Sequence, residues 1–176
     1  LGYRRIVTVG WSMGSGNVLL QGAAVQTGEG SADAIVSVSG AGRWYLRDTA
    51  AMRRVQWLIG SRSGRAAARL VLRTRVAKDG WGKKHVDAPL QPHEAIAQIS
   101  PRPVLVVHGD QDPYFTLEQP NALFGAAREP KELLVVAGCG HAEPAADERV
   151  VRGVGARARQ VVGLNAATAR ASWWGK

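Results

Sequence analysis

Ser12 stands in the segment Gly10-Trp11-Ser12-Met13-Gly14, between a short β-branched run and a helix-compatible stretch. A serine hydroxyl attacks a carbonyl carbon efficiently when a neighbouring base takes its proton. A strand that turns sharply into a helix holds such a serine above a sheet, and glycines on either side relieve the crowding of that turn. The pattern makes Ser12 a candidate nucleophile, and an ordinary helix N-cap is the alternative.

Two loops further along the chain contain a histidine and carboxylates that complete this chemistry. The segment HGDQDP begins at His108, the segment GCGH ends at His141, and each follows a strand-like apolar run. His141 is a candidate base, and a carboxylate orients such a base. We favour Asp112 because Pro113 stiffens the loop after it, whereas Asp110 lies nearer the strand and suits a turn-shaping role. Turn capping by Asp112 and a structural His141 are the alternatives.

Other reactive side chains have less support. Cys139, the single cysteine, is two residues from His141, and at that spacing in a loop the two side chains would not face each other as thiol activation requires. We interpret it as a small buried thiol. The remaining histidines lack the spacing of a metal site, so we predict no metal ion; they are His85, His93 and His108. Acyl transfer from a serine to water implies no cofactor.

Short apolar runs alternate with helix-compatible stretches along the chain. The strand-like runs are 6–9, 34–38, 104–107 and 133–136, and the helical stretches are 12–25, 43–97, 117–128 and from about 145. Continuous apolar strands separated by helices are typical of an α/β fold with a mostly parallel sheet and helices on both faces. Catalytic groups gather at the carboxyl ends of such strands, where Ser12, Asp112 and His141 are expected.

The segments GWSMG, HGDQDP and GCGH, in that order, resemble the nucleophile elbow, acid loop and histidine loop of the α/β-hydrolase family. The resemblance covers about residues 4–145. It implies a serine hydrolase that acts on a small-molecule acyl substrate, with an ester, amide or thioester as the bond cleaved. Ser12 would be the nucleophile, His141 the general base and later acid, and Asp112 the orienting carboxylate.

The resemblance also assigns residues around the nucleophile. The backbone N–H of Met13 would be one oxyanion-hole donor. Trp11, Tyr114 and Phe115 are candidate substrate-pocket residues, with core packing the alternative for the last two. Many family members carry a helical cap where this chain has the insert 43–97, which makes its aromatic residues candidates for a lid or pocket: Trp44, Tyr45, Trp57 and Trp81.

The ends of the chain depart from the family pattern. The first strands of the family and the loop with a second oxyanion donor would precede the nucleophile, yet eleven residues stand before Ser12. We therefore expect 1–176 to be a single α/β-hydrolase domain that is truncated at its N-terminus, and the chain is either a fragment of a complete hydrolase or inactive alone. The segment 151–176, rich in Arg, Gly and Ala, is a basic tail with no assigned role.

The formal charge of +9 is concentrated in two segments. Residues 43–84 hold 12 Lys and Arg with 2 Asp, residues 149–176 hold 6 Lys and Arg with no acid, and the remainder is mildly acidic. A basic surface attracts phosphates or anionic membranes. We find no basic block interleaved with aromatic residues and expect no nucleic-acid partner. The alternative function is that of a non-catalytic relative, acting as a ligand-binding or basic-surface interaction module.

Arginines at four-residue spacing from Arg65 to Arg73 are typical of the solvated face of an amphipathic helix, with Leu70 and Val71 on another side. No apolar run approaches the eighteen or so residues of a transmembrane helix. We expect a cytoplasmic protein and leave secretion open, because an N-terminal segment would lie upstream of Leu1.

Overall fold

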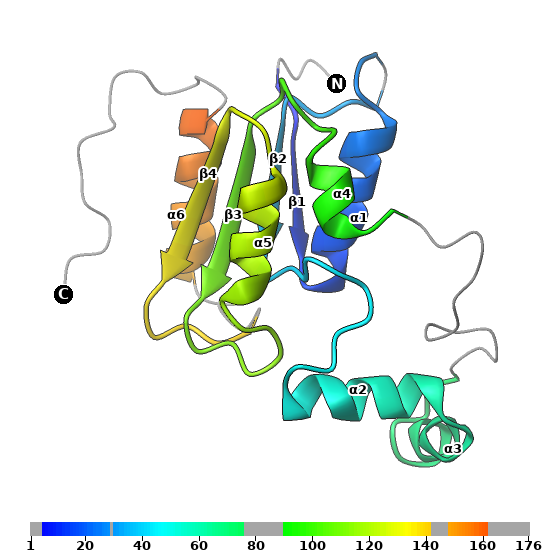
Figure 1. Cartoon of the computed structure of the whole chain (residues 1–176). Coiled ribbons are helices and arrows are strands. Elements are labelled where there is room, and N and C mark those ends of the chain that lie inside the picture. The colour runs from blue at the N-terminus through cyan, green and yellow to red at the C-terminus, as the bar shows by residue number, and fades with distance from the viewer. Residues whose placement is uncertain (1–4, 29, 76–89, 142–147, 162–176) are drawn as a thin grey trace.

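The computed structural model describes residues 5–28, 30–75, 90–141 and 148–161. Within these ranges four parallel strands form one sheet in the order β1-β2-β3-β4 (Figure 1). The strands are β1 (Val7–Trp11), β2 (Ala34–Val38), β3 (Val104–Gly109) and β4 (Lys131–Val136). The predicted parallel sheet is confirmed, and each of the four apolar runs corresponds to a strand, although β1 begins at Val7 rather than at Ile6.

Helices cover both faces of this sheet, as the α/β pattern predicts. The helices are α1 (Met13–Ala24), α2 (Ala50–Gly60), α3 (Arg62–Val71), α4 (Pro92–Ile96), α5 (Glu118–Ala126) and α6 (Glu148–Val161). α1, α4 and α5 lie on one face and α6 lies on the other (Figure 1). The sheet is therefore the middle layer of three.

Alternate residues of the central strands point to opposite faces, and both faces are apolar. Ile35 of β2 and Val106 of β3 belong to the buried cluster beneath α1, α4 and α5. Val36 and Leu105 belong to the opposite cluster, which packs against Val154 of α6. This two-sided burial explains why the strands are continuous apolar runs in the sequence rather than alternating ones.

α2 and α3 form a hairpin that stands apart from these layers, on the side toward which the strand arrows point (Figure 1). Thr49 caps α2 by accepting a hydrogen bond from the Met52 N–H, and Ser61 caps α3 through the Gly64 N–H. Glycine is needed at position 64 because a Cβ there would lie 2.1 Å from the carbonyl oxygen of Trp57. The hairpin occupies part of the insert predicted at 43–97.

α4 also lies within that insert but belongs to the body of the fold. Ala95 and Ile96 are buried in the cluster beneath α1. Gln91 caps the short helix together with Glu94, and Pro92 occupies its first turn. Among the described residues of the insert, α4 thus packs into the core, whereas α2 and α3 project from the body.

α3 buries small residues rather than large ones. Gly64 and Ala68 are its buried positions, whereas Leu70 and Val71 are 80% and 77% exposed. Arg69 is exposed as the spacing predicts, but Arg65 is half-buried. Arg73 is exposed beyond the end of α3, so the helix does not extend over all three arginines. The spacing also did not reveal that the apolar residues at the end of the helix are exposed.

Some expectations fall on residues whose structure is not described. Trp81 and His85 lie outside the described ranges, as does the part of the basic tail from residue 162 onward. None of the described helices combines the length and the apolar character required to cross a bilayer.

Candidate active site

Ser12, Asp112 and His141 lie together at the carboxyl edge of the sheet, after β1, β3 and β4 respectively. Ser12 Oγ is 2.8 Å from Nε2 of His141. Nδ1 of the same imidazole is 2.7 Å from Oδ2 of Asp112. Ser12 and His141 are 129 residues apart in the chain, yet the three side chains form one hydrogen-bonded series.

The partners of His141 fix its tautomer. A carboxylate oxygen accepts hydrogen bonds, so the contact with Asp112 requires the proton on Nδ1 of His141. In the neutral imidazole Nε2 then carries no proton and accepts a hydrogen bond from the Ser12 hydroxyl. This is the tautomer in which a histidine can take a proton from serine.

The backbone at Ser12 is bent sharply between β1 and α1. Ser12 has φ 53° and ψ −118°, a left-handed conformation that a non-glycine residue seldom adopts. Its N–H donates to the carbonyl of Val38 at 2.9 Å, which anchors the turn to β2. The side chain makes no capping hydrogen bond to α1, so the N-cap interpretation does not account for the hydroxyl.

The two glycines of the turn are not equivalent, and this leads to a testable difference. A Cβ at Gly10 would lie 2.2 Å from the carbonyl oxygen of Gly14, whereas a Cβ at Gly14 would meet nothing within 4 Å. We expect Gly10→Ala to lower the free energy of unfolding by about 1–3 kcal/mol, because the backbone must move apart. The matched variant Gly14→Ala is expected to be neutral or more stable by up to about 1 kcal/mol, since alanine favours helix. Urea unfolding measures both, and equal losses would contradict this geometry.

The side chain of Asp112 is fully buried, and both of its carboxylate oxygens accept hydrogen bonds. Oδ1 accepts the backbone N–H groups of Tyr114 at 2.8 Å and Phe115 at 3.0 Å, while Oδ2 accepts from His141. Burial by itself raises the pKa of Asp112, but the hydrogen bonds from His141 and the two amides outweigh it and hold the pKa below its usual value. The carboxylate is therefore charged and rigidly oriented.

Asp110, the rival carboxylate, joins two loops instead. Its Oδ1 accepts the N–H of Gly138 at 2.7 Å. A second bond between the same loops runs from the Gln111 N–H to the Cys139 carbonyl at 2.9 Å. These bonds fix the histidine loop relative to the acid loop. Cys139 is half-buried and packs against the apolar cluster under α6.

Tyr114 and Phe115 flank the imidazole of His141. Their ring centroids lie 4.7 Å and 5.2 Å from that of His141. Tyr114 is 37% exposed, whereas Phe115 is buried in a small cluster with Leu46 and Met52. Phe115 thus packs in the core and also contacts the imidazole of His141. A substrate-pocket role for Tyr114 and Phe115 stays a prediction.

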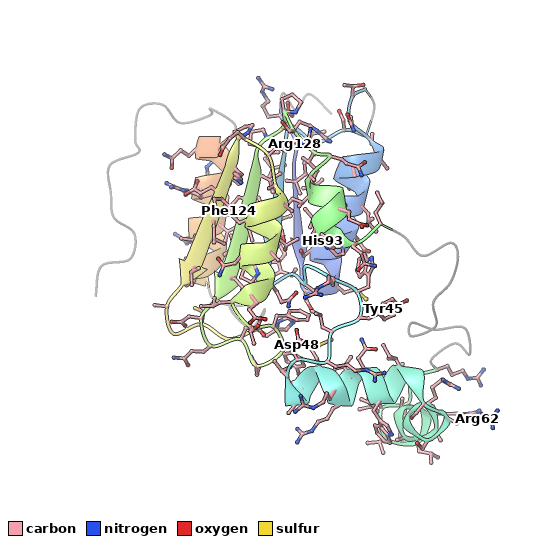
Figure 2. All side chains as sticks on the ribbon, in the orientation of Figure 1. Tyr45, Asp48, Arg62, His93, Phe124 and Arg128 are labelled. Atoms are coloured by element: carbon pink, nitrogen blue, oxygen red, sulfur yellow. The ribbon has the colours of Figure 1, made fainter. Side chains whose placement is uncertain are left out.

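The first residues of the insert are bonded to the acid loop and to α5. Thr49 Oγ1 donates to the carbonyl of Tyr114 at 2.9 Å. Gln119 donates to Asp48 at 3.3 Å and accepts from the N–H of Gly42 at 3.1 Å. Figure 2 shows Asp48 between the body and α2. The α2–α3 hairpin is therefore joined to the same loop that holds the carboxylate.

The other residues predicted around the site have different surroundings. Met13 begins α1, and the first N–H groups of a helix lack partners within it. Its side chain is 64% exposed. Trp11 packs against the cluster under α6. Trp44 lies against Gly16 of α1, where a Cβ would meet the indole ring at 2.4 Å. Tyr45 and Trp57 are exposed.

The described residues contain no group of three or more His, Cys, Asp and Glu side chains that could hold a metal ion. His93 has a structural partner, because its Nδ1 donates to the carbonyl of Gly42 at 2.9 Å. This bond fastens α4 to the segment that follows β2. Figure 2 labels His93.

Sequence comparison agrees with the fold. Residues 1–153 match the alpha/beta hydrolase family. The chain belongs to this family. A further sequence similarity relates this alpha/beta hydrolase to an uncharacterized protein of Pseudomonas aeruginosa, which is 44% identical over 50 residues, 27% of this chain and 12% of that protein.

Solved structures with the same fold include two enzymes. The chain is similar to the esterase domain of a Rhodothermus marinus protein, with a TM-score of 0.58 and 21% identity over 90% of this chain and 61% of that one. It is also similar to the monoacylglycerol lipase of Paleococcus ferrophilus, with a TM-score of 0.51 and 17% identity over 90% of this chain and 68% of that one. This alpha/beta hydrolase thus spans about three fifths of the length of the first structure, and identities this low bear on the fold alone.

His108 is a part of this alpha/beta hydrolase site that sequence patterns did not identify. It follows the apolar residues of β3, and its side chain is fully buried. Its Nε2 lies 3.0 Å from the carbonyl oxygen of Phe115 and 3.4 Å from Oδ2 of Asp112. One feature of the sequence could have indicated it, because His108 lies at the end of a buried strand, four residues before Asp112.

The burial of His108 predicts a dependence of stability on pH. Desolvation lowers the pKa of His108 below 6.5, so below about pH 6.5 the unfolded chain binds a proton that the folded chain does not. The free energy of unfolding therefore falls as the pH drops through 6.5, by at most about 1.4 kcal/mol per pH unit from this group. Urea titrations at pH 7.5 and pH 5 measure the loss. His108→Gln should reduce it, and an unchanged loss in that variant would contradict the assignment.

Proposed function

We propose that the protein is a serine hydrolase that cleaves a carboxylic ester through an acyl-enzyme on Ser12. The observation that carries this proposal is the unbroken series of hydrogen bonds from Ser12 through His141 to the buried Asp112. Membership of the alpha/beta hydrolase family supports it. No cofactor or metal ion takes part in the proposed reaction.

In the first half of the reaction Ser12 is acylated. Its Oγ forms a bond to the carbonyl carbon of the ester while the hydroxyl proton moves to Nε2 of His141, and the carbonyl π electrons move to oxygen. The carbonyl then re-forms, the bond to the alcohol oxygen breaks, and His141 gives its proton to the departing alcohol. Asp112 stabilises the imidazolium that exists between these two proton transfers.

In the second half water replaces the alcohol. Nε2 of His141 takes a proton from the water, whose oxygen attacks the acyl carbon. Collapse of the tetrahedral intermediate breaks the bond to Ser12 Oγ, and the proton returns from His141 to that oxygen. The products are a carboxylic acid and the free serine.

The N-terminus of α1 supplies favourable electrostatics for the intermediate. Both tetrahedral intermediates carry negative charge on the former carbonyl oxygen, and preorganised N–H groups stabilise such charge. The Met13 N–H lies next to the nucleophile at the start of α1. We assign it as one oxyanion donor, assisted by the positive end of the helix dipole.

Small acyl esters are the substrate class proposed, with amides and thioesters as variants of the same chemistry. The test is release of p-nitrophenolate from p-nitrophenyl acetate and butyrate by the folded, intact protein. We expect saturable release well above the rate in buffer. Absence of saturable release would contradict the proposal and favour a non-catalytic relative that binds a ligand at the same place.

A further inference from the structure

His108 is buried at the point where the acid loop leaves β3, and it contacts that loop twice. Its Nε2 lies 3.0 Å from the carbonyl oxygen of Phe115 and 3.4 Å from Oδ2 of Asp112. Oδ2 is also the atom that accepts the hydrogen bond from His141. Two imidazoles therefore face the same carboxylate oxygen, one at hydrogen-bond distance and one slightly beyond it.

The surroundings of His108 determine where its proton lies. Both groups that face Nε2 are acceptors, a carbonyl oxygen and a carboxylate oxygen, so Nε2 carries the proton and donates it to Phe115. Nδ1 is buried and has no hydrogen-bond partner among the described residues. A purely space-filling role is better served by leucine or methionine, which leave no nitrogen stranded in an apolar environment.

We propose that His108 is a positioning residue for the histidine–carboxylate pair, because its Nε2–H fixes the Phe115 carbonyl and the Asp112 carboxylate relative to β3. This inference rests on the proposed function, in which Asp112 orients His141. The segment from Asp112 to Phe115 closes a compact turn, since Oδ1 of Asp112 accepts the Phe115 N–H while His108 binds the carbonyl of the same residue. The N–H of Phe115 is thus held by Asp112, and its carbonyl is held by His108 at the end of β3.

A neutral His108 suits this task. Burial lowers its pKa, so the imidazole stays uncharged at neutral pH. An uncharged donor steadies Asp112 without neutralising it, and the negative charge of the carboxylate remains available to the imidazolium of His141. A cation at position 108 would instead compete with His141 for the same oxygen.

Three substitutions separate the donor from the volume that it fills. His108→Met removes the hydrogen-bond donor and fills the space with an apolar side chain of similar size. His108→Gln places an amide nitrogen near the position of Nε2, whereas the shorter His108→Asn places it near that of Nδ1, too far from the Phe115 carbonyl. We expect kcat for p-nitrophenyl acetate to fall about 10- to 100-fold in the Met and Asn variants, with KM within about twofold of the wild type, since small misplacements of catalytic groups cost this much. The Gln variant should recover most of the loss.

Rates are divided by the number of active sites titrated with a fluorophosphonate, so that misfolded protein does not count. A role confined to stability would lower the melting temperature of His108→Met and leave its kcat per titrated site unchanged, which would overturn the inference. If kcat per titrated site fell equally in all three variants, the proposed role of His108 as a hydrogen-bond donor would also be overturned.

A second readout does not depend on turnover. The proton between Nδ1 of His141 and Asp112 is expected to give a strongly deshielded NMR resonance because it lies in a short charge-assisted hydrogen bond. We expect this resonance to persist in His108→Gln and to shift or broaden in His108→Met. An identical resonance in both variants would overturn the inference. A wild type with this resonance but no turnover would overturn only the proposed function.

Discussion

Replacement of Ser12 by alanine is expected to lower kcat for ester hydrolysis by at least about ten-thousandfold. The substitution removes the attacking oxygen and leaves no neighbouring group in its place. It should change the fold little, because the hydroxyl makes no capping bond to α1 and its hydrogen-bond partner is His141. The measurement is kcat with p-nitrophenyl acetate, on protein whose melting temperature matches that of the wild type.

Cys139 provides the control for this experiment, because it is a nucleophilic side chain two residues from His141 in the sequence. It packs against the apolar cluster under α6. We expect Cys139→Ala to retain most of the activity. Substantial turnover by Ser12→Ala together with a large loss in Cys139→Ala would contradict the assignment of the nucleophile.

Asp112→Asn is expected to cause the second large loss, about ten-thousandfold in kcat, by changing the tautomer of His141. The two oxygens of Asp112 have different partners. Oδ1 faces two N–H donors, from Tyr114 and Phe115, and Oδ2 faces Nδ1 of His141. An asparagine keeps its amide oxygen toward the two backbone donors, so its NH2 group must face the imidazole.

The consequence falls on Nε2 of His141. When an amide donor faces Nδ1, the imidazole is favoured with its proton on Nε2, and such a ring cannot accept a proton from Ser12. Shape and volume are nearly unchanged, so the loss should appear in kcat rather than in folding. Steady-state kinetics at neutral pH and the melting temperature separate the two effects.

Asp110→Asn is the matched control, because Asp110 lies two residues away in the same loop and bonds the Gly138 N–H instead of a histidine. An amide oxygen can accept that bond, so we expect a loss of less than about tenfold. A loss in Asp110→Asn as large as in Asp112→Asn would show that loop geometry, rather than the tautomer, controls activity.

The strands and the candidate triad could be predicted from the sequence because their signals are local. A buried strand such as 104–107 is a continuous apolar run, and Ser12 and His141 each stand in a short glycine-flanked segment. The carboxyl ends of parallel strands meet at one edge of a sheet, so the order of these segments was enough to predict that they converge.

Other features depend on contacts that the sequence does not encode locally. α4 lies within the stretch 43–97 that the sequence predicts as an insert. Only its packing against α1 shows that it belongs to the body of the fold. Likewise, His108 resembles any polar residue at a strand end until the fold brings the Phe115 carbonyl to its Nε2. The exposure of Leu70 and Val71 follows from α3 packing on α2 through small residues.

The most direct test of the account is covalent labelling of the folded, intact protein with a fluorophosphonate, followed by mass spectrometry of the peptides. We expect one phosphonyl group, on Ser12, and much slower labelling of His141→Ala because Nε2 of His141 takes the serine proton. A folded protein that remains unlabelled, or one that is labelled at another residue while Ser12 stays unmodified, would contradict the assignment of Ser12 as the nucleophile.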